Sequence, residues 1–408
     1  MTDDPRMQLS DKTVNKPGAP RARHLTLSLN NPTIRAILWQ IGLGLVVILA
    51  GWYLAGNTMA NLARLSIASG FGFLDRESGV QIGESLIATG PRDSYGDIFI
   101  VGLLNTLKVS GVGIVLATIL GVLLGMARLS SNWLVARFAA TYVEAVRNVP
   151  LLLQLFIWYA LLTEGLPGPR QAEPLIPGVD IFLSNRGLKF PAPADDPVWA
   201  WVAVLFAVGV LATLAISAWN RKRQLSTGQR LPMTPIGLGL ILGLPLAFLA
   251  LSGGGAMDVP VLQGFNFRGG MTLSPEFAAL LFGLTLYTAA FIGEIVRSGI
   301  LAVPKGQTEA ATALGLSRST AMRLVILPQA LRVIIPPTTS QFLNLTKNSS
   351  LAVAIGYPDF VAVANTAINQ TGQAVEGVLS IMIVYLVISL ALSAFMNWYN
   401  RRVALVER

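Results

Sequence analysis

Long apolar stretches alternate with shorter polar segments along most of this chain. The apolar stretches follow a polar tail (residues 1–34) and cover residues 34–56, 98–127, 138–162, 198–219, 235–251, 277–300, 331–351 and 377–399. Each is close to the ~20 residues with which a helix crosses the hydrocarbon core of a bilayer. The pattern predicts an all-α polytopic membrane protein with about eight transmembrane helices. Within the second stretch, Gly121 and Gly125 are spaced for close packing against another helix.

The polar segments differ in composition. Residues 57–97 are mixed and acidic, residues 163–197 are rich in Pro, Gly and Asp, and residues 253–270 are rich in Gly. Because Gly and Pro interrupt regular structure, we expect residues 163–197 to form an irregular extramembrane segment. The first apolar stretch follows a long polar tail and lacks a small-residue cleavage site behind it, so we interpret it as a retained anchor.

Basic residues are distributed unevenly between the two sides of the predicted membrane. Segments on one side hold 21 of the 30 Lys and Arg residues, and segments on the other side hold 7. The basic set comprises the tail up to Arg35 and residues 127–147, 220–231, 297–332 and 399–408. Since basic loops stay in the cytoplasm, this distribution predicts that both termini are cytoplasmic.

Composition excludes several classes of protein. With 53% hydrophobic and 12% charged residues, the chain does not fit a soluble domain. It has no cysteine, hence no disulfide or thiolate metal site, and its one histidine, His24, lies in the polar tail. A phosphate-binding G-x-x-x-x-G-K-[ST] loop is absent from the sequence. We therefore predict no catalytic residue, metal site or cofactor, and no nucleic-acid partner, since the topology accounts for the net charge of +9.

The polar segment after the sixth apolar stretch carries an ordered motif. Glu309, Ala310 and Ala311 are followed by three residues and Gly315, and after nine more residues by Val325-Ile326-Leu327-Pro328. Gly315 can adopt the left-handed conformation that ends a helix. Ser317 or Ser319 can cap a second helix, and Pro328 would stop it. This predicts two short helices meeting at a glycine elbow, a shape suited to docking a partner, with an ordinary interhelical loop as the alternative.

This motif resembles the signature loop of permease subunits of bacterial ABC importers, with Val325 in place of a commoner isoleucine. The preceding residues 294–307, and Arg147 to Phe156, look like the amino-acid branch of that family. The likeness covers roughly residues 96–163 and 276–400. Residues 67–74 and 180–187 resemble the general L-amino-acid permease subgroup.

The resemblance implies a division of the chain. Five of the predicted helices would form the type I ABC importer permease core, within residues 98–400. Residues 35–97 would add an N-terminal helix and a periplasmic loop, and residues at about 164–275 would be an inserted segment with a helical hairpin. Residues 1–34 and 401–408 would be cytoplasmic tails.

The resemblance also implies a function and partners. The chain would form the translocation path for polar or general L-amino acids across the bacterial inner membrane, without being an enzyme itself. A separate ABC ATPase would bind the loop at 305–328, and a periplasmic amino-acid-binding protein and a related second permease chain would complete the complex in the lipid. The coupling residues would be Glu309, Ala310, Ala311, Gly315 and Pro328.

Charged and polar side chains within or beside the apolar stretches are candidates for lining the path. They are Asn105, Glu144, Arg147, Glu294, Arg297 and Lys347. Because ionised groups are costly inside a membrane, they usually face a protein interior or a cavity. Glu294 and Arg297 are three residues apart on one helix and can form a pair. The alternative role for each residue is an interhelical hydrogen bond or an interfacial anchor.

Two other classes of function remain open from these residues alone. An ion-coupled secondary transporter would use buried charges without an ATPase, but it would leave the docking motif unexplained. A membrane-embedded enzyme would need a metal-ligand cluster or a nucleophile–base pair, and the sequence supports neither.

Overall fold

The structure is a computed structural model that describes residues 32–64, 69–87 and 89–403. It divides into two compact units, residues 1–69 and 70–408, each described here by itself. The first unit contains α1 (Pro32–Arg64). Its stretch from Ile34 to Asn61 is apolar and long enough to cross a membrane, as the sequence predicts.

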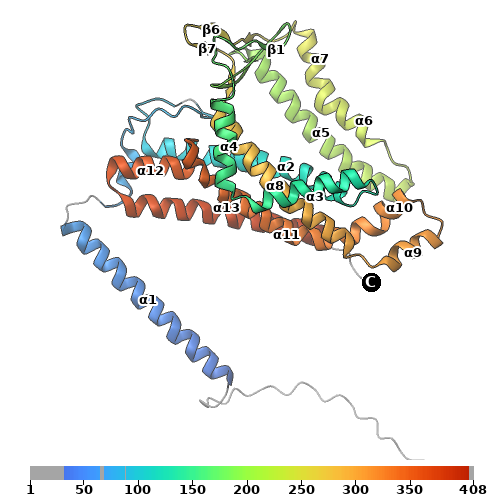
Figure 1. The fold of residues 1–408 in the computed structure, drawn as a ribbon, viewed down its shortest axis with the longest axis horizontal. Helices are drawn as coiled ribbons and strands as arrows, with labels where there is room; N and C mark the ends of the chain where they lie inside the picture. The colour runs from blue at the N-terminus through green and yellow to red at the C-terminus, as the bar shows by residue number, and fades with distance from the viewer. Residues whose placement is uncertain (1–31, 65–68, 88, 404–408) are drawn as a thin grey trace, which may run out of the picture. The chain divides into compact units, whose positions relative to one another are not determined.

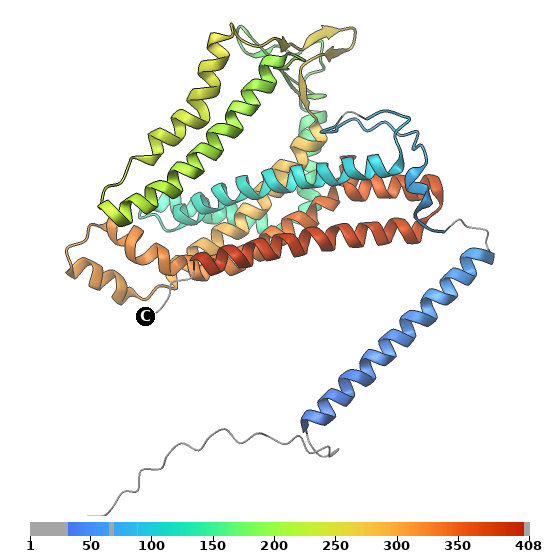
Figure 2. The ribbon, with the colours of Figure 1, turned by 180° about the vertical axis from the view of Figure 1, so that it is seen from behind.

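The second unit is mostly helical (Figures 1 and 2). It begins with the 3-10 helix η1 (Phe71–Asp75), followed by α2 (Tyr95–Arg128), α3 (Trp133–Asn148) and α4 (Leu151–Thr163). The middle region contains β1 (Pro174–Ile176), β2 (Val179–Ser184), β3 (Gly187–Phe190), β4 (Ala192–Pro193), α5 (Pro197–Thr227), α6 (Met233–Leu238), the π-helical η2 (Gly239–Gly243), α7 (Leu244–Leu251), β5 (Met257–Asp258), β6 (Val261–Gln263), β7 (Asn266–Arg268) and β8 (Met271–Leu273). The last region contains α8 (Pro275–Leu301), α9 (Lys305–Ala313), α10 (Arg318–Ala321), the π-helical η3 (Met322–Ile326), α11 (Leu327–Asn348), the 3-10 helix η4 (Ser349–Ile355), α12 (Phe360–Thr371) and α13 (Ala374–Val403).

The prediction of an all-α polytopic membrane protein is confirmed. Among the described residues, seven helices are long and apolar enough to cross a membrane, or eight if the bent pair α3–α4 counts as one span. The span predicted over residues 138–162 is bent, because α3 and α4 meet at 105°. Val149 precedes Pro150 and is extended (φ −101°, ψ 128°), as expected for a residue whose helical conformation is hindered by the following proline ring.

The segment predicted to be irregular instead forms strands, which we call the β layer (residues 174–193 and 257–273). β1, β2, β3 and β8 form one antiparallel sheet, while β4 pairs with β5 and β6 pairs with β7. Glycines supply the turns that this layer needs, since Gly178 and Gly187 have φ of 83° and 103°. Pairing of β3 with β8 and of β4 with β5 ties both ends of the α5–α7 hairpin to the layer.

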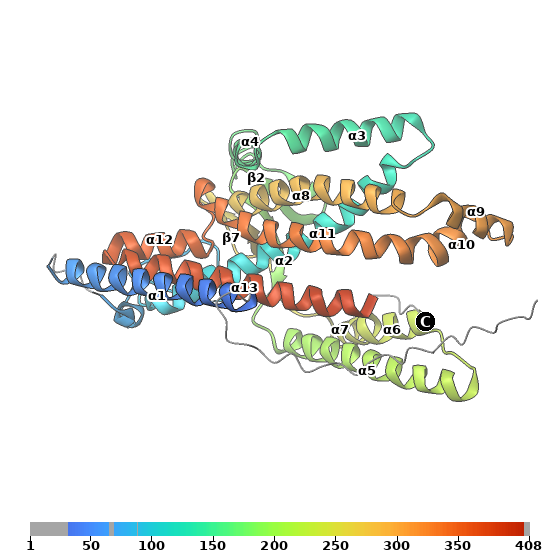
Figure 3. The same cartoon turned by 90° about the horizontal axis from the view of Figure 1, so that it is seen from below.

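The core of the second unit is centred on α8. In the most apolar part of α8, 61% of the residues are buried, whereas none are buried in the corresponding part of α13. Helix α8 packs against α2, α4 and α11, and Figure 3 shows it running beside α11. Fully buried core side chains include Val109, Leu155, Leu280, Leu284, Ile292 and Leu345. Burial on this scale identifies α8 as the interior helix and α13 as a peripheral one.

The contact between α2 and α8 depends on glycine. A Cβ atom at Gly121 would lie 2.6 Å from the Ile292 side chain, and one at Gly125 would lie 2.7 Å from the Val296 side chain. Both distances are too short for carbon atoms in van der Waals contact. The close packing predicted from the spacing of Gly121 and Gly125 is confirmed.

Substitution Gly121→Ala should therefore destabilise the protein by about 1–3 kcal/mol, because the added methyl group overpacks the α2–α8 contact. The matched control is Gly111→Ala on the same helix, where no atom lies within 4 Å of the added Cβ. The control should be neutral or slightly stabilising, since Ala favours helix over Gly. Thermal unfolding of the purified variants in detergent measures both effects, and equal melting temperatures would contradict the packing argument.

Candidate functional site

The first candidate surface is the docking loop, residues 305–328. Helices α9 and α10 lie at the end of the second unit opposite α12 (Figures 1 and 3). Gly315 has φ of 74°. The Leu316 N–H donates to Ala311 O and the Gly315 N–H to Thr312 O, the hydrogen bonds of a Schellman motif. Ser317 caps α10 by accepting from the Thr320 N–H. The predicted glycine elbow and serine cap are confirmed.

The prediction that Pro328 stops the second helix is wrong. Pro328 is the second residue of α11, and residues 318–355 form one continuous helical span. Just before it, the Leu327 N–H donates to Met322 O, five residues back, within η3. A wider π turn can accommodate a helix whose regular pattern of backbone hydrogen bonds is interrupted. Proline is tolerated in the first turn of a helix.

The docking loop presents apolar side chains to its surroundings. Leu314 is 80% exposed and Leu324 is 64% exposed. Glu309 and Ala310 are exposed as well, whereas Ala311 is 2% exposed. Exposed leucines on an ordered elbow form a surface that another protein can cover.

Asn105 serves as a tie between segments. Its side chain is buried, and its Nδ2 donates to the carbonyl oxygens of Glu84 (2.8 Å) and Pro358 (3.0 Å). The Tyr357 hydroxyl donates to the backbone oxygen of Asn105 (3.2 Å). Asn105 thus joins α2 to two segments that are remote from it in sequence.

Glu294 and Arg297 form the predicted pair, with a third member that the sequence did not identify. Arg297 Nη1 lies 3.1 Å from Glu294 Oε1, and Arg128 Nη1 pairs with Glu294 Oε2. We call Arg128, Glu294 and Arg297 the charge triad. One carboxylate serves two guanidinium groups, and the Arg128 pair fastens the end of α2 to α8.

The other predicted path residues are exposed. The Arg147 guanidinium lies 4.9 Å from the centre of the Phe291 ring, a cation–π distance. Glu144 and Lys347 have no ion pair with any residue that the structure describes. Apart from Glu294 with Arg297, the contacts of the described residues do not join the predicted path residues to one another.

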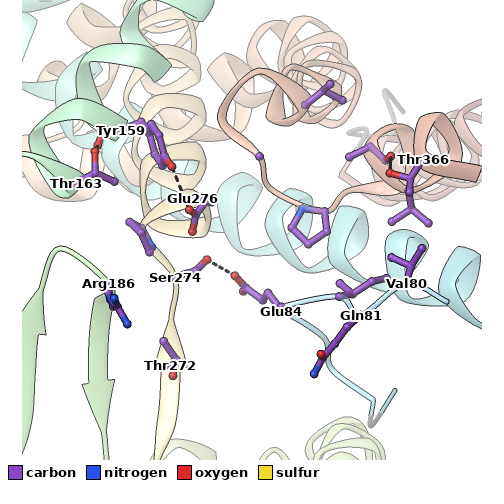
Figure 4. A pocket seen from close by; sticks show the side chains of 18 of the residues that line it. Val80, Gln81, Glu84, Tyr159, Thr163, Arg186, Thr272, Ser274, Glu276 and Thr366 are labelled. Atoms are coloured by element: carbon purple, nitrogen blue, oxygen red, sulfur yellow. Dashed lines mark hydrogen bonds between the residues drawn. The ribbon is translucent and has the colours of Figure 1, made fainter. Parts of the chain in front are cut away.

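A cavity of about 920 Å³ lies between the β layer, the loop before α2, and the helices α4, α8 and α12 (Figure 4). Its charged lining residues are Glu84, Arg186, Lys189 and Glu276. Burial lowers the pKa of Lys189. The Tyr159 hydroxyl donates to Glu276 Oε1 (3.2 Å), which fixes that carboxyl group at the start of α8. The cavity was not predicted, because its walls come from distant parts of the chain.

Glu84, which lines this cavity, forms an ion pair with a lysine of α2. Lys108 Nζ lies 2.6 Å from Glu84 Oε1 and 4.2 Å from the centre of the Phe277 ring. The Ser274 hydroxyl donates to Glu84 Oε2 (Figure 4). The Lys108 side chain is 21% exposed and that of Glu84 is 11% exposed. A lysine within an apolar stretch is a signal for such a site, but its partner could not be inferred from the sequence.

The buried carboxyl group of Asp359 holds α12, which forms another wall of the cavity. Asp359 is 0% exposed, and its Oδ1 accepts from the Ala362 N–H (2.8 Å), which caps α12. Its Oδ2 accepts from the Tyr385 hydroxyl (3.0 Å). Burial raises the pKa of Asp359 to about 6. These bonds hold α12, which lines the cavity with Ala362 and Thr366.

Comparisons with known proteins agree with this architecture. Residues 227–405 match the family of binding-protein-dependent transport system inner membrane components. The chain is 51% identical over 387 residues to YhdX, a putative amino-acid ABC transporter permease protein of Escherichia coli (strain K12), covering 94% of this chain and 98% of that protein. It is 49% identical over 384 residues to AapQ, a general L-amino acid transport system permease protein of Rhizobium johnstonii, covering 93% and 95%.

Two further similarities extend the comparison. BztB, a glutamate/glutamine/aspartate/asparagine transport system permease protein of Rhodobacter capsulatus, is 42% identical over 415 residues, covering 94% of this chain and 97% of that protein. A crystal structure of an amino acid ABC transporter with histidines matches at a TM-score of 0.45 and 22% identity, covering 76% of this chain and 95% of that one. Because the three curated relatives align over nearly their whole length, this chain belongs to the family of binding-protein-dependent transport system inner membrane components, among the amino-acid ABC transporter permeases.

Proposed function

We propose that this chain forms one half of the path through which an ATP-driven importer moves L-amino acids across the bacterial inner membrane. The observation that carries the proposal is the ordered docking loop, exposed at one end of a bundle of membrane helices. The names of the relatives, all amino-acid permeases, support the substrate class. Since the sequence contains no phosphate-binding loop, hydrolysis of ATP belongs to a separate subunit.

The docking loop would meet that ATPase through its elbow. Leu314 and Leu324 are exposed on either side of Gly315 and would insert into an apolar groove of the ATPase, as amphipathic helices do in other complexes. Burial of apolar surface contributes about 25 cal/mol per Å². Movement of the ATPase on binding ATP would then displace the loop and favour one of two states of the path.

The remaining partners follow from the same proposal. A periplasmic amino-acid-binding protein would deliver substrate at the end of the helices where the cavity lies. A related but different second permease chain would supply the other half of the path. Both termini would be cytoplasmic, and residues 164–275 would be an insertion into a core within residues 98–400.

An ion-coupled secondary transporter is the alternative, and it gives no role to the docking loop. Uptake in reconstituted vesicles separates the two. Uptake of a labelled L-amino acid by the assembled importer complex should require ATP. It should continue when proton and sodium gradients are dissipated. Gradient-driven uptake without ATP would contradict the proposal.

In the same vesicles, Gly315→Val should reduce ATPase co-purification and uptake by roughly tenfold, because a β-branched residue at positive φ costs about 1–2 kcal/mol or more. The matched control is Gly306→Val in α9, where nothing lies within 4 Å of an added Cβ and φ is not positive. The control should retain both properties. Full uptake by the Gly315→Val chain would show that the elbow is not needed for coupling.

Topology can be tested with single cysteines, because the sequence contains none. Cysteines in place of the exposed Ser226 and Ser317 should react with an impermeant thiol reagent only from the cytoplasmic side. Ser184 is 1% exposed and would be a poor site, so the exposed Arg92 and Asp180 serve for the periplasmic side. Labelling of Ser226→Cys from the periplasm would invert the α5–α7 hairpin and refute this orientation.

We also propose that the charge triad gates the inner end of the path, with Asn105, Glu144, Arg147 and Lys347 as further lining candidates. Arg297→Gln leaves Glu294 paired with Arg128, so assembly should persist while uptake falls. Glu294→Gln strands two guanidinium groups and should cost about 1–3 kcal/mol of stability as well. The yield of purified complex measures assembly and stability, and the initial rate of amino-acid uptake measures transport. Wild-type uptake by an assembled Arg297→Gln complex would leave the triad a purely structural role.

A further inference from the structure

We propose that an α-amino acid binds at the cavity wall by inserting its charged groups between Lys108 and Glu84. Its carboxylate would replace Glu84 at Lys108, and its ammonium group would pair with the displaced Glu84. This inference rests on the proposed function, because it takes the substrate to be an amino acid. It identifies the ion pair as a recognition site for the groups that all α-amino acids share.

The position of Glu84 supports the exchange. Glu84 lines the cavity and lies on the segment between η1 and α2, where the described residues 79–87 and 89–93 form neither helix nor strand. The charge triad, by contrast, joins residues of the helices α2 and α8. A carboxylate on an irregular segment can withdraw from its partner without breaking a helix.

The charges at Lys108 also favour an exchange over a simple opening. Lys108 lies against Phe277, which is 3% exposed, so a Lys108 ammonium left without an anion would remain largely desolvated. A substrate carboxylate has the charge and the two oxygens of the Glu84 side chain. The Ser274 hydroxyl, which donates to Glu84, is placed to donate to the incoming carboxylate instead. Lys108 would thus remain neutralised throughout the exchange.

The ammonium group gives the site its selectivity for zwitterions. Once displaced, Glu84 loses Lys108 as its partner, and the substrate ammonium group brings a cation into a cavity that Arg186 and Lys189 also line. The charges would then alternate in sign, in the order Lys108, substrate carboxylate, substrate ammonium group and Glu84, so that each charge has a neighbour of opposite sign. The amino-acid side chain would project into a cavity of about 920 Å³ lined by neutral polar residues that include Asn185, Asn266, Asn365 and Thr366. Such a site accepts side chains of different size.

The test uses the complete transporter in vesicles, with Gln81→Cys as a reporter, since Gln81 is exposed and lines the cavity. L-Glutamine should slow alkylation of this cysteine. Glutamine α-amide, which lacks the carboxylate, and N-acetylglutamine, which lacks the ammonium group, should not. Lys108→Met should weaken protection by about tenfold or more, as expected for loss of a hydrogen bond to a charged group. Glu84→Gln should let N-acetylglutamine protect, because a carboxylate no longer has to displace an anion.

Two controls separate this site from general effects. Lys189→Met removes a cation that lines the cavity and should leave protection unchanged, so an equal loss in both lysine variants would overturn the proposal. Should Lys108→Met fail to assemble, the wild-type complex decides, because equal protection by L-glutamine and N-acetylglutamine would overturn it. ATP-driven uptake is measured in the same vesicles. Uptake without selective protection refutes this site alone, whereas absence of both refutes the proposed function.

Discussion

The close contact between α2 and α8 is the constraint on which the rest of the second unit depends. Only glycine fits on α2 where Ile292 and Val296 of α8 approach it. The Arg128–Glu294 pair fastens one end of this contact, and Lys108 lies on Phe277 toward the other. Helix α8 begins at the cavity wall and leads into the docking loop. Its packing against α2 therefore fixes the positions of the cavity and of the docking loop.

The features that could be predicted from the sequence are local ones. The length of the apolar stretches was enough to locate the long membrane helices, because a bilayer sets that length. Gly315 and Ser317 act on backbone groups within four residues of themselves, so the elbow could be inferred from spacing alone. Family resemblance then supplied the function, which neither spacing nor composition contains.

The features that could not be predicted depend on contacts between distant residues. Strands β3 and β8 pair across the whole α5–α7 hairpin, and neither is long enough to be seen as a strand by itself. Glu84 and Lys108 find each other only after the segment before α2 has folded back on that helix. Pro328 was predicted to stop a helix but lies within a continuous one, whereas the bend of 105° at Pro150 was not predicted. Whether the helix bends or continues at each proline depends on the conformation of the neighbouring backbone. The periodicity of apolar residues contains no information on that conformation.

The continuity through Pro328 has a mechanical consequence. Residues 318–355 form a rod that at ~1.5 Å per residue is roughly 57 Å long, from the elbow to the cavity lining at Val353. A rod transmits displacement without needing to unfold. Pro336 and Pro337 lie inside it and offer no N–H to the helix, so bending should concentrate there. Movement at the elbow would thus reach the cavity lining as displacement of one continuous helix that bends mainly at Pro336 and Pro337.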